Sequence, residues 1–423
     1  MSALPSDALQ KPPLDGITVI DMSRVLSGPY CTMVLADLGA RVIKIERPDT
    51  GDDTRQWGPV VGGQSAYFMA FNRHKESIAL DLKTPYDREI FESILAAGDV
   101  IVENFRPGVM ERLGYGWEVL SSRHPRLVYA SISGYGDSGP LSDQPAYDMI
   151  IQGLSGLMSL TGEPDGPPVR VGTSIVDLGA GVFATIGICA ALAARARTGR
   201  GQKVDIAMLD GQVALLEHAL ASVALEPTVP TRSGAHHPTL APFGAFKASD
   251  GDMVIAAAND TLFGSLAGAL GQPELADDSR FLTNDRRVTN QAALQTEIDR
   301  ILGSRTVKEW IAILQEAEVP CGPINTVDNV LKDPQLLARE MFISVSDKYG
   351  NTIQTANNPV RLSAAGERPT TARSPLLDEH REALIGEFMT NNAHPKLSEI
   401  RQLAGSETVD LSFVNLAMPH SGV

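Results

Sequence analysis

The sequence predicts an α/β fold: a Rossmann-like, doubly wound parallel sheet in a large domain, with a smaller α+β domain. Short runs rich in Val and Ile alternate with longer helix-like segments, a pattern typical of β-α-β units. These runs are almost wholly apolar, as expected for strands of a parallel sheet that helices cover on both faces. The 43% of hydrophobic residues and the mean hydropathy of -0.04 are typical of a soluble globular protein with a large core.

The β-α-β pattern begins directly after a Pro-rich leader. "GITVIDM" (16–22) is predicted to be a strand and "PYCTMVLADLG" (29–39) a helix, with Pro29 suited to its first turn and Gly39 to its end. "RVIKIE" (41–46) is the next strand. The alternation continues with strands at 77–82, 99–104 and 127–136 and a helix at 86–98.

The composition changes at residues 225–242, where Pro, Thr, Ser and His accumulate without a helical period, which indicates a linker or an active-site loop. A hairpin within 243–260 is expected to turn at Asp250 and Gly251. Later segments predict helices near 260–270, 290–302 and 306–317, a hairpin near 342–355 and a helix at 378–389. We therefore expect a large-domain part at 1–224, a small α+β domain with linkers at 225–330, a return to the large domain at 331–404 and a C-terminal tail at 405–423.

Charge and composition exclude several classes of partner. The net charge of -15 argues against a nucleic-acid-binding surface, which needs a broad basic face, but permits a local basic pocket for a small anion. No apolar run approaches the length of a membrane span, so no membrane partner is expected. The N-terminal residues carry no basic-then-apolar signal segment, and the three cysteines are far apart, which together predict a cytoplasmic protein with reduced thiols. No metal-binding spacing is present, so no metal site is expected.

The first β-α-β unit invites a dinucleotide-binding interpretation, because Glu46 ends the second strand where an acidic residue would hold a ribose hydroxyl. The loop after the first strand, "SRVLSGPYC", contains a single glycine instead of the GxGxxG pattern. A pyrophosphate cannot approach the backbone closely without those glycines. A nicotinamide-dependent oxidoreductase is therefore disfavoured, and the same topology is expected to serve another ligand.

Asp177 is the carboxylate that needs an explanation in "VRVGTSIVDLGAG" (169–181), where a polar, glycine-bearing segment enters a long helical stretch. One interpretation is structural: Asp is among the best helix N-caps. The other is chemical, because the small residues beside this carboxylate would let a bulky substrate approach it. The stretch alone leaves both open.

Several stretches, taken in order from about residue 13 to residue 365, resemble the family III CoA-transferases, which include the formyl-CoA:oxalate and carnitine CoA-transferases. The resemblance is carried by "PLDGITVIDMSRVLSGPYCTMVLADLGARVIKIERPDTGDDTR", "NRHKESIALDLKTP", "ENFRPGVMERLG", "ASISGYGDSGP", "YDMIIQGLSG", "GTSIVDLGAG", "TGRGQKVDIAMLDG", "KASDGDMVIAAAND" and "VPCGPINT". It implies that Asp177 is the nucleophile. The carboxylate would form an acyl–aspartyl anhydride and then an aspartyl-CoA thioester. No permanently bound cofactor is then expected, since coenzyme A and acyl-CoA are substrates.

The resemblance also places the remaining site residues. The family's CoA-contacting positions fall on Val25, Arg47, Leu80, Lys83, Asn104, Phe105 and Arg112. The positions near the reacting acyl groups fall on Arg24, Leu26, Tyr135 and His237. Each of these residues also has an ordinary structural interpretation. The cations could be solvated or paired surface charges. Phe105 and Leu80 could be core residues, and Tyr135 and His237 could be loop residues without a role in the site.

This sequence departs from the family at informative positions. Arg24 and Leu26 replace a histidine and a glutamine of the formyl-CoA enzyme, and Ser133 replaces a lysine, which argues against the same oxalate specificity. The loop "SGAHHPTLAP" has one glycine, which argues against a glycine-rich lid and offers His236 and His237 instead.

The run from Gly234 to Asp260 is most like members that handle dicarboxylates, so succinyl-CoA is the expected donor and a C4–C6 dicarboxylate the expected acceptor. A formyl-CoA:oxalate or carnitine-type transferase remains an alternative. An α-methylacyl-CoA racemase-type isomerase is another alternative, because these racemases share the fold. They use a histidine as a base where Tyr147 stands, and a tyrosine, with a pKa of about 10, is a poor base near neutral pH. A catalytically idle CoA-binding protein is a further alternative, against which the intact Asp177 argues. The family also implies an interlocked homodimer.

Overall fold

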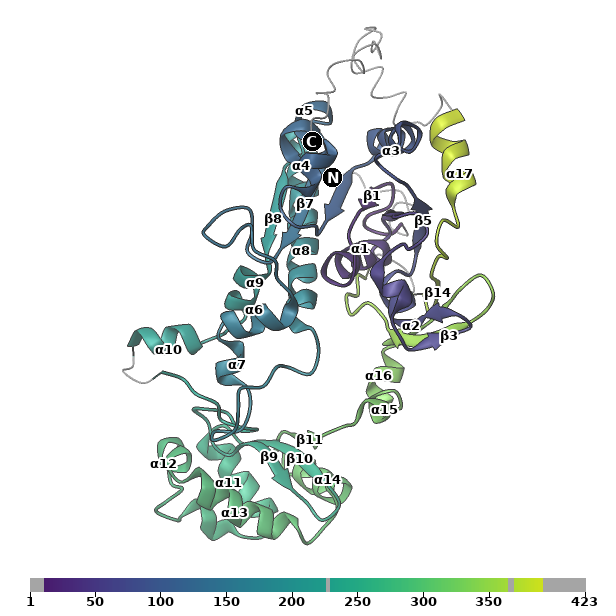
Figure 1. Ribbon diagram of the computed structural model, residues 1–423. Helices are drawn as coiled ribbons and strands as arrows, with labels where there is room; N and C mark the ends of the chain where they lie inside the picture. Colours follow the sequence, from purple (N-terminus) through teal and green to yellow (C-terminus); the bar gives the residue numbers. More distant parts are fainter. Residues whose placement is uncertain (1–10, 226–228, 364–368, 391–423) are drawn as a thin grey trace, which may run out of the picture. The chain divides into compact units, whose positions relative to one another are not determined.

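The computed structural model describes residues 11–225, 229–363 and 369–390 (Figure 1), so the predicted tail at 405–423 lies outside the described residues. The chain divides into two compact units. The first combines residues 1–144, 180–206 and 343–423, and the second combines 145–179 and 207–342. The predicted small domain, 225–330, lies within the range of the second unit.

A parallel sheet forms the centre of the first unit. In the described residues it has six strands in the order β5-β2-β1-β6-β7-β8. Their bounds are β1 Thr18–Asp21, β2 Arg41–Glu46, β5 Lys75–Ala79, β6 Val100–Glu103, β7 Val128–Ser133 and β8 Lys203–Ala207. The pairs β5–β2, β2–β1, β1–β6 and β6–β7 are all parallel, which confirms the predicted parallel sheet. Counted along the chain, this is the 3-2-1-4-5-6 order of dinucleotide-binding sheets.

Helices cover both faces of this sheet, as the apolar strands require. Residues of β1 alternate: Ile20 packs in a core with α3 (Pro85–Ala97) and α5 (Trp117–Arg123), whereas the neighbouring Asp21 accepts a hydrogen bond from Thr32 of α1 (Ser27–Asp37). A Cβ on Gly181 of α8 (Ile175–Thr198) would lie 2.7 Å from a backbone oxygen of α1, so α8 packs tightly against α1. Alternate residues of β1 therefore face the helices on opposite sides of the sheet.

Local sequence signals explain where these helices begin and end. Thr84 caps α3 by accepting the Asp87 amide hydrogen, Pro85 occupies the first turn, and Gly98 ends the helix. Gly39, directly after α1, has φ of +99°, a conformation in which glycine avoids the steric penalty of a side chain. The helices predicted at 29–39 and 86–98 are thus confirmed within two residues at each end.

The other elements of the first unit are short. They are β3 Val60–Val61, β4 Gln64–Ser65, α2 Ala66–Phe71, α4 Val109–Leu113, β12 Phe342–Ser346, β13 Thr352–Ala356, β14 Thr371–Arg373 and α17 Arg381–Ile385, with 3-10 turn Asp53–Gln56 and π-turn Gly386–Thr390. β12 lies between β13 and β14 in one sheet, which agrees with the hairpin predicted near 342–355. α17 begins within the helix predicted at 378–389.

The second unit contains the predicted hairpin. β9 (Phe243–Lys247) and β10 (Asp252–Ala256) pair antiparallel across a turn at Asp250 and Gly251, and β11 (Cys321–Pro323) pairs antiparallel with β10. The helices near this sheet are α11 Asp260–Ala269, α12 Asn284–Thr289, α13 Gln291–Leu302 and α14 Val307–Glu316. Phe246, Phe281 and Trp310 are almost fully buried between sheet and helices. The three helices predicted at 260–270, 290–302 and 306–317 are confirmed.

The remaining elements of the second unit lie on either side of this hairpin in the sequence. They are α6 Asp148–Leu154, α7 Leu157–Leu160, α9 Met208–Ala214, α10 Ala219–Leu225, 3-10 turn Pro273–Ala276, α15 Val327–Val330 and α16 Pro334–Ala338. Helix α6 contacts both α7 and α9.

The expectation that no apolar run approaches a membrane span is wrong for α8. This helix has 24 residues and a mean hydropathy of 2.0, long and apolar enough by composition to cross a bilayer. Its glycines and alanines make close contacts, however: a Cβ on Gly187 would lie 2.5 Å from Val204 of β8. Core helices pass the same test of length and composition, so the finding is weak evidence for a membrane.

Candidate active site

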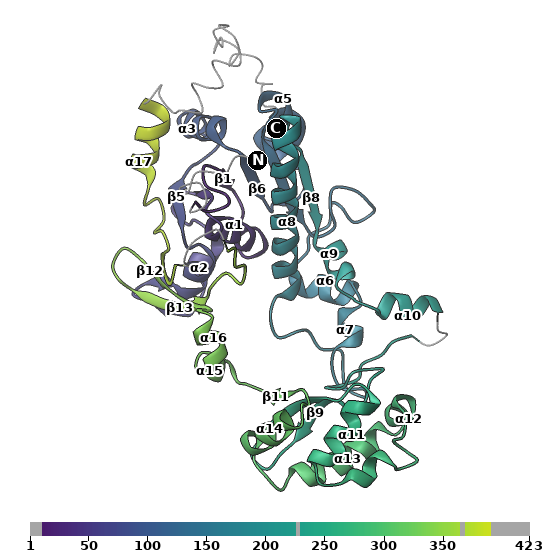
Figure 2. The same cartoon turned by 180° about the vertical axis from the view of Figure 1, so that it is seen from behind.

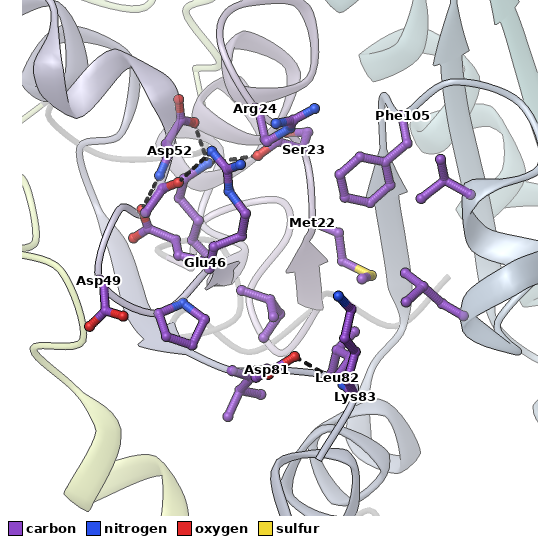
Figure 3. A pocket seen from close by; sticks show the side chains of 18 of the residues that line it. Met22, Ser23, Arg24, Glu46, Asp49, Asp52, Asp81, Leu82, Lys83 and Phe105 are labelled. Carbon is purple, nitrogen blue, oxygen red and sulfur yellow. Dashed lines mark hydrogen bonds and ion pairs between the residues drawn. The ribbon is translucent and has the colours of Figure 1, made fainter.

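A pocket of about 650 Å³ opens in the first unit where the parallel strands end (Figure 3). Met22 follows β1, Arg47 follows β2, Leu80 follows β5 and Phe105 follows β6, and all four line it. The chain order reverses between β1 and β6, and ligands of open α/β sheets bind at such a switch point, beyond the carboxyl ends of the strands. The pocket therefore lies at the loops whose residues the family resemblance assigns to CoA binding.

A buried ion cluster fixes the loops after β1 and β2. The Lys44 ammonium lies 3.0 Å from the Asp52 carboxylate and donates a hydrogen bond to the Ser23 carbonyl oxygen at 2.9 Å. The Lys75 ammonium lies 2.9 Å from the carboxylate of Asp21, and all four ionic side chains are almost inaccessible. Burial opposes ionisation of Asp52, but Lys44 and the hydrogen bonds from Thr54 hold its pKa below the usual range. The cluster therefore connects the ends of two strands to the pocket wall.

Glu46, the residue that suggested a ribose-binding acid, is already engaged. Its carboxylate lies 2.6 Å from the Arg55 guanidinium, accepts the Ser77 hydroxyl at 2.6 Å and accepts the Asp52 amide hydrogen at 2.9 Å. Burial opposes its ionisation, but Arg55 holds its pKa below the usual range. Glu46 therefore anchors the loop after β2 to the neighbouring strand.

Five of the seven positions that the family resemblance assigns to CoA line this pocket, and so does Arg24. The lining includes Arg24, Arg47, Leu80, Lys83, Phe105 and Arg112. In Figure 3, Met22, Lys83 and Phe105 lie on one side of the pocket and the acidic residues Asp49 and Asp52 on the other. Arg24 also lies over the Phe105 ring, with its guanidinium carbon 5.6 Å from the ring centroid.

Val25 and Asn104, predicted to contact CoA, support the pocket wall without lining it. The Asn104 side chain accepts the Arg24 amide hydrogen at 2.8 Å and donates to the Arg24 carbonyl oxygen at 2.8 Å. The Val25 amide donates to Asp52 at 3.2 Å, and Val25 has φ of +69°, which is rare for a β-branched residue. Strained backbone of this kind gathers at functional sites.

The cations at the pocket differ in how they are paired. Arg24 and Arg47 both form ion pairs with Asp53. Lys83, Arg106 and Arg112 are exposed, and within the described part of the chain no carboxylate forms an ion pair with them. Arg106 was not predicted, although it directly follows Phe105 in the same motif, "ENFRPG".

Asp177 is the third residue of α8, which begins at Ile175 in the second unit. It is therefore not the N-cap that the structural interpretation proposed. Asp148, the first residue of α6, supplies a hydrogen-bond acceptor for free backbone N–H groups at the start of α8. Its Oδ2 accepts the amide hydrogens of Val176 at 2.9 Å and Asp177 at 3.3 Å. Figure 2 shows α6 beside the start of α8. Neither Asp148 nor Gln152, which donates to Asp148 at 2.6 Å, was predicted, although both lie in the quoted motif "YDMIIQGLSG", which begins at Tyr147.

The surroundings of Asp177 favour its protonated form. Burial, and then the negative charge of Asp148, raise its pKa from 3.8 to about 7. Across the described residues no cation forms an ion pair with its carboxylate. A Cβ on Gly179 would still lie 3.3 Å from Leu215, so the first turn of α8 is closely packed. Perturbed carboxylates of this kind are candidates for functional groups.

The other predicted substrate residues lie apart from the pocket lining. Leu26 is buried at the start of α1, and Tyr135 lies in the loop after β7. His237, in the second unit, accepts the Thr239 amide hydrogen at 3.2 Å and stacks on Phe243 and on His218. Tyr147 is 74% exposed, and Ser133 lines a second cavity of about 270 Å³. Among the described residues, no group of three His, Cys, Asp or Glu side chains is placed to hold a metal ion.

These features define a class: an α/β protein with a cation-lined pocket at the switch point of a parallel sheet and a partly buried carboxylate that forms no ion pair with a cation among the described residues. Residues 14–381 match the family model of CoA-transferase family III. The chain belongs to CoA-transferase family III and is a CoA-transferase enzyme.

Known relatives span nearly the whole chain. The acetyl-CoA:oxalate CoA-transferase of Acetobacter aceti is 47% identical over 387 residues, covering 91% of this chain and 98% of that protein. The succinate–glutarate CoA-transferase of Agrobacterium fabrum is 38% identical over 395 residues, covering 90% of this chain and 97% of that protein. The crystal structure of a CAIB/BAIF family protein from Brucella suis has a TM-score of 0.81 at 41% identity, covering 90% of this chain and all of that one.

Proposed function

We propose that this enzyme transfers CoA from an acyl-CoA donor, succinyl-CoA, to a C4–C6 dicarboxylate through covalent intermediates on Asp177. The observation that carries the proposal is the partly buried carboxylate of Asp177, whose pKa burial and Asp148 raise to about 7. A carboxylate with a raised pKa is a stronger nucleophile once it is ionised, and near neutral pH a substantial fraction is ionised.

The chemistry balances without a permanently bound cofactor. The ionised Asp177 oxygen attacks the thioester carbonyl, which forms an acyl–aspartyl anhydride and releases CoA thiolate. The thiolate attacks the aspartyl carbonyl, which forms an aspartyl-CoA thioester and releases the donor acid. The acceptor carboxylate then attacks this thioester, and the same steps in reverse deliver the new acyl-CoA. Both intermediates hydrolyse in water, so the site must exclude it.

CoA binding is assigned to the pocket of the first unit. Its diphosphate and ribose phosphate need cations, and charge-assisted hydrogen bonds to phosphate are strong. Arg47, Lys83 and Arg112 supply them, with Arg106 as a further donor, whereas Leu80 and Phe105 supply apolar walls. Val25 and Asn104 hold the loop that carries Arg24.

The acceptor pocket is assigned to Arg24, Leu26, Tyr135 and His237. Both relatives named above act, by name, on dicarboxylates, which supports a second carboxylate on the acceptor. Acetyl-CoA:oxalate transfer is the second candidate, because the relative with that name is 47% identical.

Two measurements test the proposal. After mixing with succinyl-CoA, mass spectrometry should find a CoA adduct on the peptide that contains Asp177, and the adduct should be lost in Asp177→Asn. The exposed Asp165→Asn in the same unit is the matched control. A panel of acceptors with succinyl-CoA and acetyl-CoA identifies the substrates: transfer only to monocarboxylates such as carnitine would refute a dicarboxylate acceptor. Epimerisation of an α-methylacyl-CoA with no transfer would favour the racemase instead.

The assembly and location of the enzyme are part of the same proposal. We expect an interlocked homodimer in the cytoplasm, as in the family. Exposed apolar side chains support a second copy, among them Leu225, Val327 and Ile186, which are 86%, 81% and 57% exposed in the single chain.

A further inference from the structure

Asp148 stands out as a buried carboxylate with no cation beside it. Its exposed fraction is 9%, and within the described residues no ion pair involves it. Oδ1 accepts the Gln152 side-chain amide at 2.6 Å, and Oδ2 accepts the backbone amides of Val176 and Asp177. Gln152 in turn accepts the Val171 amide hydrogen at 2.9 Å. The carboxylate is therefore fixed at both oxygens against the turn that carries Asp177.

We propose that Asp148 is a positioning residue for the transfer reaction, which fixes the first turn of α8 and disfavours the anionic form of Asp177 relative to its neutral acylated forms. This inference deepens the proposed function and rests on Asp177 being the nucleophile. The hydrogen bonds supply the positioning, since they bind the Asp177 amide itself. The negative charge of Asp148 repels the anionic form of Asp177 and so shifts the equilibrium toward its neutral covalent forms.

The bias follows from where the negative charge resides at each step. Free Asp177 is an anion beside a second anion, in a partly buried place where charges are poorly screened. When Asp177 attacks the thioester, its negative charge leaves with the CoA thiolate, and the anhydride is neutral. When the thiolate attacks in turn, the charge leaves with the donor carboxylate, and the aspartyl-CoA thioester is neutral. Repulsion by Asp148 therefore acts on the free carboxylate and is relieved in both covalent intermediates.

Helix α6 packs on α9. Besides Asp148, the titratable side chains in or near these two helices are Tyr147 before α6, Asp210 on α9, and Glu217 and His218 after α9. Of the described residues, Asp148 alone contributes a charge that acts on Asp177, and burial is the larger cause. Removing the charge of Asp148 should consequently remove part of the perturbation and leave the part due to burial.

Asp148→Asn tests the inference, because asparagine keeps an acceptor oxygen for the α8 amides yet carries no charge. Its NH2 group cannot accept the hydrogen bond that Gln152 donates to Asp148, so that bond is lost in the variant. The acid limb of kcat/KM for succinyl-CoA should have its midpoint near pH 7 in the parent. In the variant it should fall by about one pH unit. The amount of CoA adduct at pH 8 should fall about tenfold, since one pKa unit corresponds to tenfold in an equilibrium constant. At pH 5 the two proteins should form similar amounts.

Controls separate this inference from the proposed function. Asp210→Asn, on α9, should change neither the midpoint nor the adduct. Asp148→Ser, which also keeps an acceptor oxygen without charge, should reproduce the shift if Asp148→Asn folds poorly. An unchanged midpoint and adduct in both variants, with Asp177→Asn inactive, would overturn the role of Asp148 alone. Full activity of Asp177→Asn would instead overturn the proposed function.

Discussion

Asp177 destabilises the folded chain when it is ionised, and this predicts that removing its charge stabilises the protein. Its folded pKa, about 7, lies above the ordinary 3.8, so the folded state loses stability as pH rises between these values. Among the described residues, no cation pairs with this side chain and no hydrogen bond to it would be lost to offset the gain. At pH 8, Asp177→Asn should raise the free energy of unfolding by about 2 kcal/mol, measured by urea denaturation. Near pH 4 the difference should vanish, and a variant less stable than the parent at pH 8 would contradict this account.

The cations of the pocket predict how affinity for CoA is divided among residues. Lys83→Ala and Arg112→Ala should each raise KM for the acyl-CoA about tenfold with little change in kcat, because each removes a phosphate contact without touching the reacting atoms. Lys308→Ala is the matched control, since Lys308 is an exposed lysine of α14 that does not line the pocket. Repeating the assay with 3′-dephospho-CoA esters shows which residue binds the ribose phosphate: its variant should lose the tenfold effect. Unchanged KM in both variants would place CoA elsewhere.

The candidate site could be predicted from sequence to the extent that each residue lies in a recognisable stretch. The strand-end residues Arg47, Leu80 and Phe105 fall at the pocket because strand carboxyl ends meet at one edge of a parallel sheet. Asp148 was missed because its role depends on a contact between residues 28 and 29 positions apart in sequence. Local sequence also left open that Asp177 is a helix cap, and only the three-dimensional contact shows that another carboxylate, Asp148, accepts the amide hydrogens at the helix start.

At the scale of elements, Lys44 of β2 holds two loops of the pocket, and its loss should destabilise the fold. Its side chain is 1% exposed and neutralises Asp52 and, at 3.8 Å, Asp21. Lys44→Met would leave both carboxylates short of a buried cation, which costs about 3–5 kcal/mol. Urea denaturation at pH 7 measures this loss. Lys332→Met, at an exposed pair on the surface, is the control and should cause no measurable change.

The same cluster predicts the acid sensitivity of the sheet. Opposite charges nearby keep the pKa values of Asp21, Glu46 and Asp52 below their ordinary values despite burial. A carboxylate with a lowered folded pKa stabilises the fold above its unfolded pKa, and this stability is lost as pH falls. The free energy of unfolding should therefore decrease steeply below about pH 4. In Lys44→Met the decrease should be shallower, because protonation of Asp52 no longer breaks an ion pair, whereas Asp21 keeps its ion pair with Lys75.

The elements were predicted best where sequence signals are local. The strands at 41–46 and the hairpin turning at Asp250 follow from apolar runs and turn residues, and the structure has both. The strand predicted at 77–82 instead spans Lys75–Ala79, because Lys75 and Glu76 are polar residues that pair with β2. A buried lysine inside a strand cannot be anticipated from a hydrophobic pattern, since its partner Asp21 lies on another strand.

At the scale of the whole molecule, α8 connects the two units in sequence, since its first residues belong to the second unit and the rest to the first. Its composition would suit a membrane, and Val182 and Ile186 on it are 43% and 57% exposed in the single chain. These two residues are four apart and share one face of the helix. Lipid or protein often covers an exposed apolar face of this kind, and the proposed homodimer assigns this face to a second copy of the chain.

Ile186→Asp distinguishes whether lipid or a second copy of the chain contacts this face of α8. If a second copy covers α8, the parent should remain in the supernatant after membranes are sedimented, with a mass by light scattering of twice the 45.2 kDa chain. The variant should then dissociate toward the monomer, because a buried unpaired carboxylate opposes association. Tyr349→Asp, at an exposed turn residue, is the control and should remain dimeric. A parent protein that sediments with membranes and is released only by detergent would show that lipid covers this face, whereas a monomeric parent in the supernatant would show that neither covers it.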